Sequence, residues 1–257
     1  MLSPKKRLLL ILLFFATLSS CVLMQTAMAV GTLGRISDSS FLDSNNNLYV
    51  VGEVKNTGDV AVQNTNVRVV FYNSTNQKIT AIEGYADLNV ILPGRRSFFS
   101  IKMLESEGAL NVMNYSIWFN WTDAPAGKPL GLVILSNSSS VDSAGHMHVT
   151  GQVQNQGTLN SNNTEVSATF YNSSGVVVGA SWAFSNPANL LPNQTATFDI
   201  ELIYPQQVAK VASYGLTAES NALALIPEFS SFLLPSLLLV TMTLGLVFFK
   251  RRRFSPK

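Results

Sequence analysis

The chain contains two histidines, His146 and His148, separated by one residue. In an extended strand this spacing directs both imidazole rings to the same face. Two imidazole nitrogens on one face can begin a transition-metal site. A third ligand at a suitable spacing is missing, and the aligned residues of an earlier copy of this segment are Asn47 and Tyr49. We therefore interpret the pair as ordinary strand-surface residues, and expect no metal and no cofactor.

Other residue types that carry reactions are sparse. The only cysteine, Cys21, lies in an apolar N-terminal segment, and no Gly-x-Ser-x-Gly motif accompanies the histidines. A Ser-His-Asp arrangement therefore has no support. Asp43, Asn45 and Asn47 match the first half of a calcium loop, but Leu48 stands where that loop needs glycine. A hairpin turn is the better interpretation there, and we expect no catalytic residue and no enzyme activity.

The residue type with the clearest chemical role is asparagine, as an acceptor for glycans. Seven asparagines have Ser or Thr two positions later and no proline between, which is the acceptor pattern for N-linked glycans. They are Asn73, Asn114, Asn120, Asn137, Asn162, Asn172 and Asn193. Because glycan acceptors must be accessible, we expect these residues on exposed loops and several of them to be glycosylated. Asn73 and Asn172 hold equivalent positions at a predicted hairpin turn.

Three tryptophans are candidates for a binding surface. Trp118 and Trp121 lie near a predicted strand end beside a linker, and Trp182 has Glu83 as its counterpart in the other copy. Exposed indoles could stack on sugars or contact a partner, and they could equally be buried between two domains. Both interpretations stay open, with interdomain packing favoured by the nearby linker.

These residues are positioned by a sequence that occurs twice. The stretch Gly52–Asn73 returns without a gap as Gly151–Asn172, and the same offset of 99 relates Phe99 to Phe198. A repeat of this length is a domain rather than a solenoid unit. We expect two domains, 31–122 and 130–221, joined by the Pro-containing linker 123–129.

Apolar and polar residues alternate with a period of two in both copies. Phe198 and Ile200, for example, alternate with Asp199 and Glu201. This pattern is typical of strands in antiparallel sheets with one buried face. The strands predicted in the first copy are 34–37, 47–55, 63–73, 77–84, 96–103 and 112–120, with equivalents 99 residues later. The expected fold is all-β, with two tandem antiparallel β-sandwiches of the immunoglobulin-like kind.

The two ends carry export and membrane signals. Residues 1–29 have a basic start, an apolar run and Ala27-Met28-Ala29, which is the layout of a helical signal peptide. Residues 229–249 are uncharged and apolar, and as a helix of about 31 Å they match the hydrocarbon core. The basic tail 250–257 should stay in the cytoplasm. We expect a single-pass cell-membrane protein with extracellular repeats.

The repeated stretch resembles the FxLYD family of small extracytoplasmic β-sandwiches. The resemblance rests on a Gly-x-Val-x-Asn-x-Gly strand and turn followed by Phe-Tyr-Asn. Those residues are Gly52, Val54, Asn56, Gly58 and Phe71-Tyr72-Asn73, with copies from Gly151 to Asn172. It implies a fold and a surface setting, and it brings no catalytic residue.

The C-terminal end is similar to the PEF-type sorting tail of archaeal surface proteins. Pro227-Glu228-Phe229 precedes the apolar span and the basic tail. The resemblance implies an archaeosortase-like transpeptidase that exchanges the tail for a lipid anchor, and simple anchoring through 229–249 stays open beside it. At the other end, Leu18-Ser19-Ser20-Cys21 resembles a lipoprotein box, an alternative to cleavage after Ala29.

Charge excludes one class of partner. Between Val30 and Ile226 the chain has nine Lys and Arg against fourteen Asp and Glu, whereas nucleic-acid binding needs clustered cations on the folded part. We expect no nucleic-acid partner. The leading hypothesis is a non-enzymatic cell-surface glycoprotein for adhesion, envelope structure or binding to a surface-layer or other envelope protein. The alternative is an accessory or docking subunit of a membrane transporter or a secreted enzyme complex.

Overall fold

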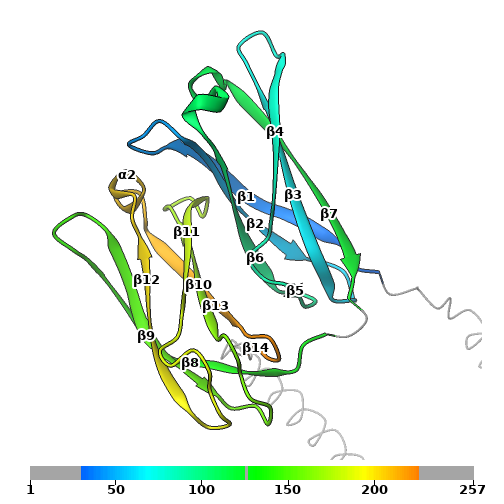
Figure 1. Ribbon diagram of the computed structural model, residues 1–257, viewed down its shortest axis with the longest axis vertical. Coiled ribbons are helices and arrows are strands. Elements are labelled where there is room, and N and C mark those ends of the chain that lie inside the picture. Colours follow the sequence, from blue (N-terminus) through cyan, green and yellow to red (C-terminus); the bar gives the residue numbers. More distant parts are fainter. Residues whose placement is uncertain (1–29, 125–126, 226–257) are drawn as a thin grey trace, which may run out of the picture. The chain divides into compact units, whose positions relative to one another are not determined.

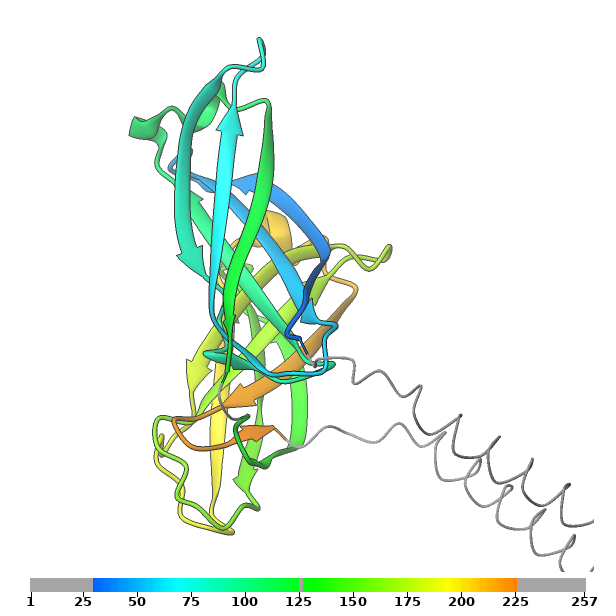
Figure 2. The ribbon, with the colours of Figure 1, turned by 90° about the vertical axis from the view of Figure 1, so that its right-hand side faces the viewer.

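The computed structural model describes residues 30–124 and 127–225. These residues form β-strands in antiparallel sheets with almost no helix (Figure 1, Figure 2), so the predicted all-β class is confirmed. The predicted signal peptide at 1–29, membrane span at 229–249 and basic tail at 250–257 lie outside the described residues. Within the described ranges, no helix has the length and apolar character needed to cross a membrane.

The chain divides into two compact units, one ending at Gly127 and the other beginning at Lys128. The described part of the first unit contains seven strands and two short 3-10 turns. These are β1 (Leu33–Leu42), β2 (Leu48–Asn56), β3 (Val62–Tyr72), β4 (Lys78–Tyr85), β5 (Val90–Ile91), β6 (Arg96–Met103), η1 (Glu105–Glu107), η2 (Ala109–Asn111) and β7 (Asn114–Asp123).

Two antiparallel sheets make up the first unit. One has the strand order β1-β2-β6, and the other has β4-β3-β5 with β7 paired to β3. The core cluster takes Val50 from β2, Phe99 and Ile101 from β6, and Val69 and Phe71 from β3. Both sheets therefore turn their apolar positions to one shared core, as the period-two alternation predicts.

The second unit repeats this chain path with the same offset. Its elements are β8 (Leu130–Val141), β9 (Met147–Asn155), β10 (Glu165–Tyr171), β11 (Val177–Phe184), β12 (Thr195–Leu202), α2 (Pro205–Val208), β13 (Ser213–Glu219) and β14 (Ala224–Leu225). The hydrogen-bonded strand order is β11-β10-β13-β14-β8-β9-β12. Core residues come from both ends of this order, for example Phe170 from β10 and Ile200 from β12.

The last short strand places the end of the second unit beyond the predicted boundary at 221. Ser220 caps the bend with its hydroxyl, which accepts the backbone N–H of Leu223 at 2.9 Å. Leu223 is only 1% exposed, and β14 pairs in parallel with β8 and antiparallel with β13. Sequence alternation does not predict β14, because a two-residue strand is too short to show a pattern.

The predicted linker 123–129 is likewise partly structured. Asp123 closes β7, and its Oδ1 accepts the backbone N–H of Gly31 at 3.1 Å. At the other end, the Lys128 ammonium donates to the Ser220 carbonyl at 2.7 Å and pairs with the Glu219 carboxylate. Each end of the linker is therefore held by its own unit.

Candidate functional site

The two histidines lie on the outer surface of the second unit, and alternation along the strands puts them there. In β9, Met147 and Val149 point into the core, so His148 between them points outward. In β12, every second residue is buried, including Ile200 and Leu202, which leaves Asp199 and Glu201 on the outer face. The two strands pair antiparallel with Glu201 directly opposite His148.

This register brings both histidines against carboxylates. His148 Nδ1 lies 3.0 Å from Asp199 Oδ1, and His146 Nδ1 lies 2.6 Å from Glu201 Oε1. The hydrogen bond to Asp199 is the main reason that the pKa of His148 is raised above its usual value. A carboxylate that accepts from an imidazole favours the charged ring, so His148 keeps a proton to higher pH than a free histidine.

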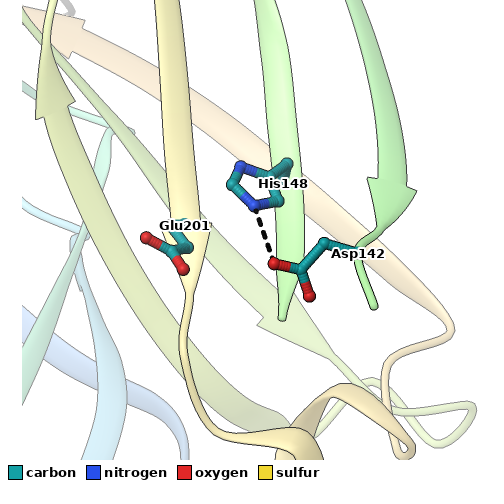
Figure 3. A group of neighbouring side chains, drawn as sticks. All are labelled: Asp142, His148 and Glu201. Atoms are coloured by element: carbon teal, nitrogen blue, oxygen red, sulfur yellow. Dashed lines mark ion pairs between the residues drawn. The ribbon is translucent and has the colours of Figure 1, made fainter. Parts of the chain in front are cut away.

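A third carboxylate comes from the turn between β8 and β9. Asp142 Oδ1 accepts the backbone N–H groups of Ala144 at 2.9 Å and His146 at 2.8 Å, and the bond from His146 is the main cause of a lowered Asp142 pKa. The other oxygen, Oδ2, lies 3.6 Å from His148 Nε2 and 4.0 Å from His146 Nδ1. Figure 3 shows the carboxylate of Asp142 directed at the His148 ring, with Glu201 beside them on β12.

The structure therefore corrects one step of the sequence analysis. The spacing along the chain predicts no third ligand for the histidine pair, yet ligand atoms of Asp142, His148 and Glu201 all lie within 4.8 Å of one another. Spacing along the chain reveals only ligands that are close in sequence, whereas strand pairing brings in Glu201 from more than fifty positions away. The alternation of Asp199 and Glu201 with apolar residues was visible, but the partner strand and its register were not.

The first unit keeps only the aspartate of this group. At the positions equivalent to Asp142, His146, His148, Asp199 and Glu201 it has, in that order, Asp43, Asn47, Tyr49, Ser100 and Lys102. Asp43 Oδ1 accepts the N–H groups of Asn45 and Asn47 at 2.8 and 2.9 Å, and its Oδ2 accepts the Asn47 amide at 2.9 Å. Lys102 lies over the Tyr49 ring, 5.4 Å from its centroid. This turn is the hairpin that the sequence predicted in preference to a calcium loop.

Two of the three tryptophans, Trp118 and Trp121, lie on β7 and have different surroundings. Trp118 on β7 is 65% exposed and lies across from Arg68 on β3, which pairs on its other side with Glu83 on β4. These residues line an open hollow of about 630 Å³. Trp121, three positions on, packs against the core of its own unit and donates its indole N–H to the Gly31 carbonyl at 3.2 Å.

Trp182 belongs to the second unit. It lies on β11, is 47% exposed, and meets Phe184 edge to face with ring centroids 5.2 Å apart. Both aromatic rings stand on one face because they are two positions apart in a strand. Trp118 and Trp182 are thus exposed aromatic residues on separate units, and Trp121 serves the packing of the first.

All seven candidate glycan acceptors lie at the surface. Asn73 and Asn172 are half-buried, and the other five are exposed. Asn73 and Asn172 stand at the β3–β4 and β10–β11 turns, but Asn114, Asn120 and Asn137 lie within strands β7 and β8 rather than on loops. The side-chain oxygen Oδ1 of Asn137 also accepts a hydrogen bond from the Tyr214 hydroxyl at 2.8 Å. Surface access thus comes from outward-facing strand positions as well as from loops.

Comparison with known proteins gives no family. No protein-family model matches the chain, and no curated protein matches it. Among solved structures it is similar to the exo-chitosanase CsxA of Amycolatopsis orientalis, at 13% identity and a TM-score of 0.29, over 74% of this chain and 26% of that one. It is also similar to red sea bream transglutaminase, at 8% identity and a TM-score of 0.24, over 80% of this chain and 32% of that one. The chain spans about a third or less of those proteins, and such weak likenesses carry no argument about function.

Proposed function

We propose that this chain is a non-enzymatic cell-surface glycoprotein that displays two tandem immunoglobulin-like β-sandwiches for adhesion, envelope structure or partner binding. The observation that carries the proposal is the placement of the seven sequon asparagines, none of which is buried. Asparagine is usually exposed in folded proteins, and these seven asparagines meet the access requirement for glycosylation. Acceptors that are used must be reachable, and here every one is.

The membrane and sorting assignments belong to the same proposal. They rest on the sequence of 1–29, 227–229 and 229–257. They comprise export and a span at 229–249 that either anchors the chain itself or is removed by an archaeosortase-like transpeptidase in exchange for a lipid anchor. With the basic tail in the cytoplasm, both units stand outside the cell, where a surface-layer or other envelope protein is the expected partner. Trp118 and Trp182 supply exposed aromatic contacts for such a partner.

Whole-cell protease treatment combined with intact mass tests the proposal. In an archaeal host that glycosylates exported proteins, we expect both units to be cleaved by external protease on unbroken cells. The mature chain should be heavier than its processed sequence, and the excess should fall when Asn73→Gln and Asn172→Gln are combined. Protection until the cells are lysed, or an unmodified mass, would contradict the proposal.

Purification of the chain from a membrane extract separates display from the accessory-subunit alternative. A display protein is expected to be recovered without a fixed partner. Recovery of one stoichiometric membrane protein that is lost in Trp118→Ala and kept in Trp121→Phe would assign the chain to an accessory role. Trp121→Phe is a suitable control because the Trp121 side chain packs against the core of its own unit and bonds the Gly31 carbonyl.

A further inference from the structure

We propose that Asp142, His148 and Glu201 bind one divalent transition-metal ion, with Zn²⁺ as the best-suited ion, on the outer face of the second unit. Asp199 and His146 act as positioning residues. This site goes beyond the surface role proposed above and stands or falls independently of it.

The ligand atoms are close to the separation that a metal ion needs. Metal–nitrogen and metal–oxygen bonds of about 2.0–2.2 Å place tetrahedral ligands about 3.3–3.5 Å apart. His148 Nε2 and Asp142 Oδ2 are 3.6 Å apart, and ligand atoms of the three residues all lie within 4.8 Å of one another. Closing the set around an ion therefore shortens the longest ligand separation by at most about 1.5 Å.

Each ligand residue is held by a second contact, and in Asp142 and His148 this contact leaves the binding atom directed at the site. Asp142 uses Oδ1 for two backbone N–H groups, so Oδ2 is left facing the histidines. Asp199 holds His148 through Nδ1, which turns Nε2 toward Asp142. His146 holds one oxygen of Glu201. A carboxylate behind a ligating imidazole is the usual supporting arrangement at metal sites.

His148 has fewer N–H donors in its neutral form than it has carboxylates to satisfy. Its two ring nitrogens both face carboxylates, Asp199 at 3.0 Å and Asp142 at 3.6 Å. A neutral imidazole has a single N–H, so it satisfies one of these carboxylates and turns a lone pair toward the other. Either a second proton or a metal ion on Nε2 resolves that conflict, and the mixture of imidazole and carboxylate ligands suits zinc and its neighbours among the transition metals.

The internal repeat supplies a comparison on the same scaffold. The turn aspartate is kept as Asp43, while the four other positions hold Asn47, Tyr49, Ser100 and Lys102, with an ammonium in place of Glu201. The first unit satisfies Asp43 with the Asn47 amide and packs Lys102 on Tyr49. The fold therefore does not require histidines and acids here. Only the second unit carries the full ligand set.

Zinc titration of the purified full-length chain tests the site. A Cys21→Ser background removes the only thiol, and imidazole-labelled histidine makes both ring signals reporters of this site, since the chain has no other histidine. We expect one Zn²⁺ per chain and a shift of the His148 signal. His148→Tyr or Glu201→Lys, which install the residues of the first unit, should weaken binding at least about 100-fold, and Asp199→Ser about 10-fold to 100-fold.

A transplant gives the converse test. Asn47→His, Tyr49→His, Ser100→Asp and Lys102→Glu together should raise the stoichiometry from one Zn²⁺ to two. Thermal unfolding of every variant checks that it is folded, and His148→Gln replaces His148→Tyr if the latter is not. The proposal is overturned if Zn²⁺ does not bind saturably, if a folded His148 variant binds as tightly as the parent, or if the histidine signals stay unchanged at saturation.

Discussion

At the scale of single residues, the asparagine of the repeated motif makes the same contacts in both units. Asn155 is fully buried. Its amide nitrogen donates to the carbonyls of Leu159 at 2.8 Å and Leu190 at 3.0 Å, and its oxygen accepts the Gly157 N–H at 2.9 Å. Asn56 makes the same three bonds in the first unit. One side chain thus bonds three backbone groups and ties the turn to a segment 35 positions away, which no apolar residue can do.

Replacing this amide by a carboxylate tests the assignment. Asn155→Asp has the same shape but cannot donate, so its charged oxygen would face two carbonyl oxygens in a buried site. We expect it to destabilise the second unit by about 3–5 kcal/mol, and Asn155→Ala by about 2–4 kcal/mol. Urea unfolding of the full chain measures both values.

Thr158→Asp provides the control, because Thr158 is exposed and its counterpart in the first unit is already Asp59. Its effect should stay within about 0.5 kcal/mol. An Asn155→Asp chain no less stable than Thr158→Asp would show that the amide network is not needed.

At the scale of elements, the hairpins share one turn design. Asn73 Oδ1 accepts the N–H groups of Thr75 at 3.0 Å and Gln77 at 2.9 Å, and Asn172 accepts those of Ser174 and Val176 in the same way. The fourth residue of each turn has positive φ, 60° at Asn76 and 75° at Gly175. Asp43 and Asp142 organise the β1–β2 and β8–β9 turns similarly, so the turn that holds the histidine cluster is a structural device common to both units.

The left-handed position gives a graded prediction. Gly175→Ala should destabilise the second unit by about 1 kcal/mol, since an added Cβ there meets no other atom and the cost is confined to the backbone conformation. Gly175→Asn, which copies Asn76, should cost less than Gly175→Ala, because asparagine tolerates this region better. Thermal unfolding of the two variants side by side measures the difference. Equal effects would show that the left-handed backbone is not what selects Gly or Asn.

At the scale of the whole molecule, the two units have separate cores. Every member of one cluster lies between Leu33 and Trp121, and every member of the other lies between Leu132 and Leu223. Each unit thus buries apolar surface with residues of its own, and no disulfide forms within the chain because the sequence has a single cysteine. A unit of about a hundred residues can support such a core alone.

Separate expression tests this independence together with the revised boundary. Residues 30–127 and 128–225 should each unfold in one cooperative transition. A piece ending at 221 should be less stable than 128–225 by at least about 2 kcal/mol, because it lacks the buried Leu223 and the strand β14. Denaturant unfolding of the three pieces measures this. Equal stability of the two second-unit pieces would show that residues 222–225 do not stabilise the unit and that it ends at 221.

The sequence by itself determined what depends on neighbours along the chain. The motif repeated at an offset of 99 predicts the duplication. Alternation fixes which face of a strand each side chain takes, so it predicts the longer strands and the outward placement of His148 and Glu201. The turn positions of Asn76 and Gly175 were readable for the same reason, because a tight turn is decided by a few consecutive residues.

Only the tertiary structure decided which strands pair and in which register. A shift of one residue between β9 and β12 would move Glu201 away from His148 without changing the pattern of either strand. The closure of the second unit by β14 and the packing of Trp121 against its own core depend equally on distant partners. Pairing energy is set by residues some fifty positions apart, and a local pattern contains no information about which of them will meet.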